Sequence, residues 1–311
     1  MVRPPAQNST AMTAPSLPAA AIVNPTAGSS SRHTRTRPLA ERARRAFAEA
    51  RLTGEIVLTE GVGHARELAT EFVRRGFSPI IAWGGDGTVN EVATALAFQD
   101  AVLGIVPTGS GNGLARELGI SLCPERAIVT AARGIDRRID IGELSGRLFF
   151  NLAGVGLDAS VASLFSRLAG RGLLRYVQAT LSTVFSYAAE TYTITAGGET
   201  CEQRALIVAL ANGRQYGNGA VIAPHAKLDD GLLDLVVVGP RNPLHAIWDV
   251  RSLFNGTIDM MPDVSMRTAS SITISAEEPI RFHVDGEVVD GSTLLTATVH
   301  PGALRVKVPG R

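Results

Sequence analysis

Apolar runs and helix-like segments alternate along the first part of the chain. Short apolar runs typical of buried parallel strands occur at AAAIV (19–23), EIVLT (55–59), SPIIAW (78–83) and AVLGIVP (101–107). Segments with helical spacing lie between and after them, at 39–51, at 64–76, from Thr88 onward, at 113–118 and at 124–134. This alternation predicts a parallel sheet with helices on both faces, over residues 18–136.

From residue 137 onward the pattern changes to short strand-like runs that often alternate between apolar and polar positions. They extend from RRIDIGEL (137–144) to ALRVKVP (303–309), with helical stretches at about 158–189 and 243–254. This pattern predicts a mainly antiparallel second domain over residues 137–311. Residues 1–17 contain no continuous apolar segment, and we predict a disordered tail there.

Composition narrows the class of protein. The chain has 311 residues, of which 45% are hydrophobic and 19% charged, as in soluble globular proteins of about two domains. The formal net charge of +1 gives no general case for binding nucleic acid. No apolar stretch approaches the roughly 18–20 residues that span a bilayer, and no secretory signal is apparent. Cys123 and Cys201 are far apart and form no metal-type pair. We therefore expect a cytoplasmic protein.

Lysine usage excludes one kind of phosphate site. The only lysines are Lys227 and Lys307, and neither follows the glycine-rich pattern of a P-loop. A nucleotide triphosphate would have to be held by glycine-rich backbone, by arginine or by a metal ion.

The segment WGGDGTVNEV (83–92) is the first candidate for such a site. Its glycines lie where a buried strand turns into a helix, and the spacing of Thr88 and Glu91 predicts a capping box. Free amides and the helix dipole favour phosphate binding at this point. An ordinary tight turn is the alternative. Asp86, between the glycines, favours a function because an acid beside phosphate can serve Mg²⁺ or accept a proton.

Two further loops of small residues follow other predicted strands, VNPTAGSS (23–30) and PTGSGNG (107–113). Loops at the carboxyl ends of parallel strands converge on one crevice, so we expect all three to lie together. Thr59 ends the remaining strand and would lie at the same edge, either in the site or merely exposed to water.

The second domain contributes two acidic turns, KLDDGLLDL (227–235) and HVDGEV (283–288). The first is readily explained as a simple turn before a strand, and the second as a β-hairpin turn. Taken alone, neither turn decides between a structural and a functional role.

The motifs GGDGTVNEV, NPTAG and PTGSGNGLAREL resemble the diacylglycerol kinase catalytic domain family, which includes bacterial soluble lipid kinases, sphingosine kinases and ceramide kinases. FNLAGVGLDASV (150–161), KLDDGLLDL and HVDGE follow in the family's order, so the resemblance covers roughly residues 20–308. It implies an α/β nucleotide domain, a β-sandwich domain and a substrate bound between them. About the last 12 residues are expected to pack back on the first domain.

The resemblance also implies an ATP-dependent kinase that uses Mg²⁺ and transfers phosphate to a lipid such as diacylglycerol or a sphingoid base. Glu287 matches the family's proposed proton acceptor, and Asp86 matches the acid given that role in sphingosine kinases. A structural Mg²⁺ would be bound by the Asp230 carboxylate and the backbone carbonyls of Lys227 and Leu232. The implied nucleotide contacts are Asn24, Pro25, Thr26, Ala27, Gly28, Thr59, Gly84, Gly85, Asp86, Gly87, Thr88, Val89, Asn90 and Ser110.

One departure from the family's pattern bears on the substrate. Gly113 occupies a position where many bacterial members have an acid, and the loop is nearer to that of sphingosine and ceramide kinases. Asp158 matches a position near the lipid head group in sphingosine kinases, or is only a helix N-terminal acid. The identity of the acceptor lipid stays open.

Other functions compatible with the GGDG loop are a NAD kinase, a sugar kinase and a nucleotide-binding regulator without catalysis. For a lipid kinase we expect peripheral contact with the inner membrane surface, and a homodimer is a further candidate assembly. Arg167, Arg171 and Arg175 are spaced four apart within a predicted helix, and residues 31–45 are also basic. Both segments are candidates for membrane contact or for solvated helix faces.

Overall fold

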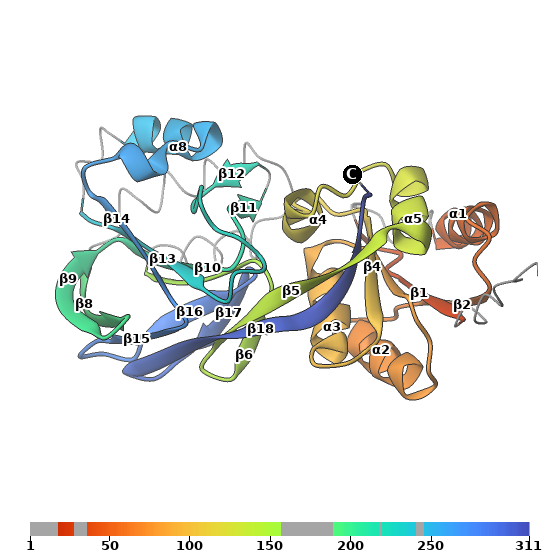
Figure 1. Ribbon diagram of the computed structural model, residues 1–311, viewed down its shortest axis with the longest axis horizontal. Helices are drawn as coiled ribbons and strands as arrows, with labels where there is room; N and C mark the ends of the chain where they lie inside the picture. Colours follow the sequence, from red (N-terminus) through yellow and green to blue (C-terminus); the bar gives the residue numbers. More distant parts are fainter. Residues whose placement is uncertain (1–17, 28–35, 157–188, 218, 241–245, 311) are drawn as a thin grey trace, which may run out of the picture.

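The computed structural model describes residues 18–27, 36–156, 189–217, 219–240 and 246–310 (Figure 1). The predicted helix at 158–189 and Asp158, Arg167, Arg171 and Arg175 therefore lie outside the described residues, as does Gly28. Among the described residues, no helix is long and apolar enough to cross a membrane.

The first domain is a three-layer α/β structure. Its four strands pair in parallel in the order β2-β1-β3-β4. They are β1 (Ala19–Val23), β2 (Gly54–Leu58), β3 (Ile80–Gly84) and β4 (Val102–Pro107). Helices α1 (Thr36–Glu49) and α5 (Pro124–Arg133) cover one face, and α2 (His64–Arg74) and α3 (Asp86–Leu96) cover the other (Figure 1). The short helix α4 (Gly113–Glu117) follows β4.

The central strands form because their residues are apolar along their whole length. Every residue of β1, β3 and β4 is buried, as expected for strands covered by helices on both faces. Trp83 and Ile81 of β3 are fully buried and pack with Phe72 of α2 in the main core. The rigid sheet fixes where the three glycine-rich loops emerge.

The second domain is an antiparallel β-sandwich. One sheet has the order β14-β13-β10-β7-β16-β17, and the other continues as β18-β15-β8-β9. Its strands are β5 (Ile135–Leu144), β6 (Arg147–Phe149), β7 (Leu152–Gly156), β8 (Glu190–Ala196), β9 (Glu199–Ala205), β10 (Ile207–Ala211), β11 (Gln215–Gly217), β12 (Ala220–Val221), β13 (Leu233–Val238), β14 (Val264–Ala269), β15 (Ser271–Ser275), β16 (Arg281–Val284), β17 (Glu287–Asp290) and β18 (Leu294–Val308). Helix α8 (Ala246–Asn255) and the 3₁₀ turn η2 (Ile258–Met260) complete it. The predicted fold class is confirmed.

Strand β18 joins the two domains. Its end pairs in parallel with β4, where Arg305 lies opposite Val102, and its length pairs with β5. The ten-stranded sheet therefore runs through both domains, and the predicted boundary at residue 136 falls inside β5. Two sequence segments, at 293–300 and 303–309, form this one strand, with an irregularity between His300 and Leu304.

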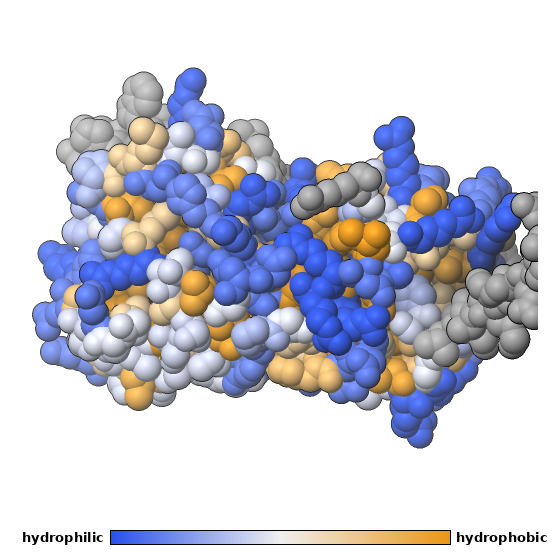
Figure 2. Space-filling model, viewed as in Figure 1, coloured by the Kyte–Doolittle hydropathy of each residue, from blue (hydrophilic) through white to orange (hydrophobic). Residues whose placement is uncertain are grey.

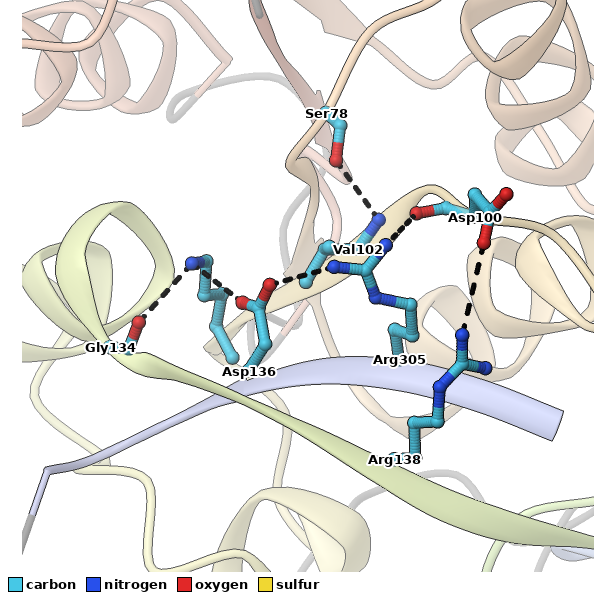
Figure 3. A network of polar contacts seen from close by, with 8 residues as sticks. Ser78, Asp100, Val102, Gly134, Asp136, Arg138 and Arg305 are labelled. Atoms are coloured by element: carbon cyan, nitrogen blue, oxygen red, sulfur yellow. Dashed lines mark hydrogen bonds and ion pairs between the residues drawn. The ribbon is translucent and has the colours of Figure 1, made fainter. Parts of the chain in front are cut away.

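Ion pairs reinforce this junction (Figure 3). The Asp136 carboxylate lies 2.6 Å from Lys307 Nζ and 2.9 Å from Arg305 Nη2. Arg305 also donates to the backbone carbonyl of Asp100, and Arg138 Nη2 lies 3.8 Å from the carboxylate of Asp100. Figure 2 shows hydrophilic residues concentrated over the middle of this view, where β5 and β18 cross between the domains. These contacts hold the second domain at a fixed place beside the sheet of the first.

Candidate active site

Three loops at the carboxyl ends of β1, β3 and β4 line a pocket of about 250 Å³. The sequence-predicted site residues in its wall are Asn24, Thr26, Ala27, Gly85, Asp86, Gly87, Thr88 and Ser110. Gly109 also lines it and was not predicted. The convergence expected from the parallel sheet is therefore present.

Asn24 organises the first loop and ties it to the second. Its Nδ2 donates to Thr88 Oγ1 at 2.9 Å, while its Oδ1 accepts from the backbone N–H and the hydroxyl of Thr26, both at 2.9 Å. These hydrogen bonds fix the conformation of the loop after β1 and attach it to the N-terminal turn of α3.

The glycines of the pocket have different reasons to be glycine. A Cβ on Gly84 would lie 2.5 Å from the Thr88 side chain, and one on Gly109 would lie 2.6 Å from the Cα of Gly85. These positions are required by packing between the loops themselves. A Cβ on Gly87 would meet nothing within 4 Å, and Gly87 lines the pocket. Of these three glycines, Gly87 alone leaves space that a ligand can use.

Asp86 joins the second loop to the third. Its Oδ2 accepts from the backbone N–H of Asn112 at 2.8 Å, and its Oδ1 accepts from that of Gly113 at 2.7 Å. Asn112 has a left-handed backbone with φ 53°, and its Oδ1 accepts from the N–H of Gly109. Both oxygens of Asp86 therefore stabilise the shape of the pocket.

The capping box predicted from Thr88 and Glu91 is wrong. Helix α3 begins at Asp86, with Gly85 as N-cap and no side-chain cap. The Glu91 carboxylate instead accepts from the N–H groups of Gly63 at 2.9 Å and Ala65 at 3.0 Å, at the start of α2. The helix starts earlier than the pattern predicted. Gly85, in the glycine-rich turn, is already its N-cap, and Asp86 is its first residue.

Asp285 connects the pocket to the second domain, and sequence reasoning missed it. Its carboxylate accepts from Asn90 Nδ2 on α3 at 2.9 Å, and from the backbone N–H groups of Phe150, Asn151 and Leu152. Burial raises the pKa of this carboxyl above its ordinary value, although the four hydrogen bonds oppose the shift. The Asp-Gly hairpin signal concealed this role because it explained the acid as a turn residue.

Glu287 begins β17, two residues after Asp285, and its side chain is exposed. Its backbone pairs with Val284 of β16, but no hydrogen bond or ion pair links its side chain to another described residue. The hairpin predicted at Asp285–Gly286 is present, with φ 46° and 88°. Glu287 is thus presented on a turn whose first residue is anchored to α3.

The other predicted nucleotide residues lie around the pocket without lining it. Thr59 is buried after β2, and its N–H donates to the Val23 carbonyl. Val89 is buried in the core, and Pro25 lies between Asn24 and Thr26 in the first loop. Asn90 contacts Asp285 instead of the pocket.

The DDG turn precedes β13 and contains the predicted metal ligands. Asp230 Oδ1 accepts only from the N–H of Leu232 within its own turn, at 3.1 Å, and its side chain is exposed. Burial and the nearby Asp230 charge raise the pKa of Asp234 to about 6. An oxygen-binding cation would relieve this repulsion, and a carboxylate with backbone carbonyls suits Mg²⁺. Among the described residues, those of the DDG turn included, no group of three His, Cys, Asp or Glu side chains is arranged to hold a metal.

Asp140 fixes this turn by accepting hydrogen bonds from backbone N–H groups. Its carboxylate accepts from the N–H of Gly231 and from the N–H of Gly302 in β18, both at 2.7 Å. Asp229 pairs with Arg137 of β5 at 2.8 Å. The turn is therefore fixed to the strands that join the two domains.

Comparison with known proteins gives a consistent result. Residues 18–144 match the model of the diacylglycerol kinase catalytic domain, and residues 151–308 match that of the YegS C-terminal NAD kinase beta sandwich-like domain. A protein of Pseudomonas aeruginosa named "Probable lipid kinase YegS-like" is 33% identical over 251 residues, covering 79% of this chain and 82% of that protein. A protein of the same name from Yersinia pseudotuberculosis is 31% identical, covering 83% and 88%.

Solved structures show the same fold. A crystal structure of a diacylglycerol kinase from Bacillus anthracis superimposes with a TM-score of 0.74 at 23% identity, covering 95% of this chain and 98% of that one. At this identity the likeness concerns the fold alone.

Proposed function

The chain belongs to the family of lipid kinases that combine a diacylglycerol kinase catalytic domain with a YegS-type β-sandwich domain, and from this premise we propose that it transfers the γ-phosphate of ATP to a lipid hydroxyl. Diacylglycerol and sphingoid bases are the acceptor classes we favour. The observation that carries the proposal is the hydrogen bond from Asn90 of α3 to Asp285, because it attaches the hairpin that carries Glu287 to the helix whose N-terminus lines the glycine-rich pocket.

ATP fits the pocket through backbone groups. The N-terminus of α3 and the loop of Gly109 and Ser110 border the cavity, and Gly87 leaves its wall free of side-chain atoms. Free helix N-terminal amides bind phosphate without a lysine. Binding through backbone amides agrees with the composition, because the two lysines of the chain are both distant in sequence from these loops.

The two acids differ in what surrounds them, and we assign them different roles. Asp86 uses both oxygens to hold Asn112 and Gly113, so it positions the loops and the phosphates. Glu287 is exposed on a turn anchored by Asp285, so it is free to accept the proton of the attacking hydroxyl. Phosphoryl transfer depends mainly on positioning and charge, and proton removal comes late.

Mg²⁺ would supply charge neutralisation and structural support when bound. We propose a structural ion at the DDG turn, held by the Asp230 carboxylate and the backbone carbonyls of Lys227 and Leu232. The Asp230 side chain is exposed and accepts only from the N–H of Leu232 within its own turn, which leaves its carboxylate oxygens available to a cation. Asp140, which holds this turn and β18 together, would connect it to the junction of the two domains.

The cellular setting follows from the acceptor. We propose a cytoplasmic enzyme that works at the inner membrane surface, with a lipid as substrate and without a nucleic-acid partner. A homodimer is compatible with this setting and is left to measurement.

The test is ATP turnover with purified protein, Mg²⁺ and a panel of acceptors. Diacylglycerol, sphingosine and a total lipid extract are supplied in detergent micelles, beside NAD and fructose 6-phosphate, and products are identified by mass spectrometry. We expect a phosphorylated lipid. Phosphorylation of NAD or of the sugar would establish the corresponding alternative kinase, and ATP binding without any product would indicate a regulator.

Two variants test the assigned roles. Glu287→Gln should keep wild-type ATP affinity and lose at least about 100-fold in turnover, the usual contribution of a general base. Asp86→Asn should weaken ATP binding and lower stability, because an amide cannot accept from both Asn112 and Gly113. Wild-type turnover by Glu287→Gln would remove Glu287 as the acceptor.

A further inference from the structure

None of the described residues that line the phosphate pocket is positively charged. Asp86 is the only charged residue among them, and the rest are glycines, an alanine and the polar residues Asn24, Thr26, Thr88 and Ser110. A triphosphate is strongly anionic, and its transfer is accelerated when positive charge neutralises the group that moves. We therefore searched the elements around the pocket for a side chain that can bring such a charge.

Arg116, in the short helix α4, is that side chain. The strands β1, β3 and β4, the helices α3 and α4, and the described loop residues between them contain no other lysine or arginine. Arg116 Nε donates to the backbone carbonyl of Gly111 at 2.9 Å. Helical side chains lean toward the N-terminus of their helix, so this bond directs the arginine back over the third loop of the pocket.

The positive charge of Arg116 is not used within the described part of the protein. The residue is half-buried, its Nη groups donate to no described residue, and no described carboxylate pairs with it. The oxygens of Asp86 are occupied by the N–H groups of Asn112 and Gly113. Two parallel N–H donors in a planar fork are the arrangement that binds phosphate oxygens in pairs. Arg116 therefore has its phosphate-binding groups available.

Helix α4 lies where the pocket approaches the second domain. A Cβ on Gly113 would lie 3.1 Å from Nδ2 of Asn151, and α4 packs against β11 (Figure 1). A Cβ on Gly111 would lie 2.8 Å from Asp86 Oδ2, so the residue that holds Arg116 adjoins the pocket wall. For an acceptor held between the domains, the γ-phosphate is the part of ATP that must lie at this end.

We propose that Arg116 binds the γ-phosphate of ATP through its Nη groups and stabilises the charge on this group during transfer. The proposal rests on the proposed function, because it assigns a further residue to that reaction. The bond from Nε to Gly111 orients the guanidinium before ATP arrives, so less side-chain entropy is lost on binding. The competing explanation is a structural role, in which Arg116 only ties α4 to the third loop.

The test compares the binding of ATP and ADP, which differ by the γ-phosphate. Calorimetry in Mg²⁺ gives both affinities for the wild type, Arg116→Gln and Arg116→Lys. Arg45→Gln is the matched control. It removes the same charge from an exposed position in the C-terminal half of α1, and Arg45 makes no side-chain hydrogen bond or ion pair to a described residue.

We expect Arg116→Gln to bind ATP roughly 10- to 100-fold more weakly and ADP almost as the wild type does, the range for a lost hydrogen bond between charged groups. Arg116→Lys should lose less, because it keeps the charge without the planar fork. Equal losses for ATP and ADP in Arg116→Gln, or no loss of either, overturn the proposal. If Arg116→Gln does not fold, an unchanged ratio of ATP to ADP affinity in Arg116→Lys overturns it.

Product analysis with lipid acceptors separates this proposal from the proposed function. A loss of ATP preference in Arg116→Gln supports the γ-phosphate contact even if the wild type phosphorylates no lipid. An unchanged ATP preference beside a phosphorylated lipid overturns the contact and leaves the lipid kinase in place. Absence of ATP binding by the wild type overturns both.

Discussion

Substitution of Gly87 separates the needs of the ligand from the needs of the fold. A Cβ at this position meets no atom within 4 Å, and the backbone is in a conformation that any residue adopts. Gly87 lies in the first turn of α3, where glycine is less favourable than alanine by up to about 1 kcal/mol. If only folding mattered, alanine would be the better residue.

The predicted effects on stability and on binding therefore have opposite signs. Gly87→Ala should raise the free energy of unfolding by about 0.5–1 kcal/mol. The added methyl group would stand in the wall of the 250 Å³ pocket, between the phosphates and the helix amides. Loss of one hydrogen bond to a charged group costs about 1.5–3 kcal/mol, so ATP affinity should fall by roughly 10- to 100-fold. Gly87→Val should weaken it further.

The assay pairs isothermal calorimetry with ATP and denaturant unfolding of the free protein. Ala95→Gly, in the same helix but away from the pocket, is the matched control, expected to lose about 1 kcal/mol of stability and to bind ATP normally. Gly109→Ala is a second reference, because its Cβ would lie 2.6 Å from the Cα of Gly85 and should destabilise the loops. Wild-type ATP affinity in Gly87→Ala would refute the assignment of phosphate to this wall.

Three further predictions follow from individual carboxylates. Asp285→Asn should lower the free energy of unfolding by about 1–3 kcal/mol, since each oxygen of Asp285 accepts from two N–H groups and the amide nitrogen that replaces one oxygen cannot accept. Because the native pKa of Asp285 is raised, wild-type stability should decline as pH rises from about 4, and this slope, measured by urea unfolding, should be absent from the variant. Asp230→Asn should make the melting temperature independent of Mg²⁺, whereas an unchanged metal response would leave the turn purely structural. Glu91→Ala should cost about 1 kcal/mol through loss of the cap on Gly63 and Ala65, and amide exchange at these two residues should speed up.

Most of the fold was accessible from local pattern. The runs predicted at 19–23, 101–107 and 124–134 match β1, β4 and α5 to within one residue at each end, because fully buried strands and a proline-started helix leave strong signals. The pairing of β18 with β4 left no such signal. It depends on contact between segments about 200 residues apart, and no local period reports it.

The candidate site likewise contains residues that the sequence predicted and one that it did not. Asn24, Asp86, Gly87 and Ser110 were predicted because glycine-rich loops after parallel strands have a recognisable sequence. Asp285 was not, since its four hydrogen-bond partners come from α3 and from the residues that lead into and begin β7, and a hairpin turn already explained the residue. Sequence identifies a turn readily, but not the carboxylate that the fold buries behind it.

The position of β18 has a consequence for biosynthesis. The sheet of the first domain has an unpaired edge at β4 until the strand containing Arg305 and Val306 reaches it, and Arg305 bonds to a residue 205 positions earlier. Nascent chain leaving a ribosome must therefore keep an apolar strand edge exposed while the whole sandwich is translated. Pairing between strands so far apart in the sequence also slows folding, because the long intervening chain loses conformational entropy before the stabilising contact forms. The sheet of the first domain is completed only after the second domain has been made, so a chain that stalls early presents an unpaired strand edge at β4.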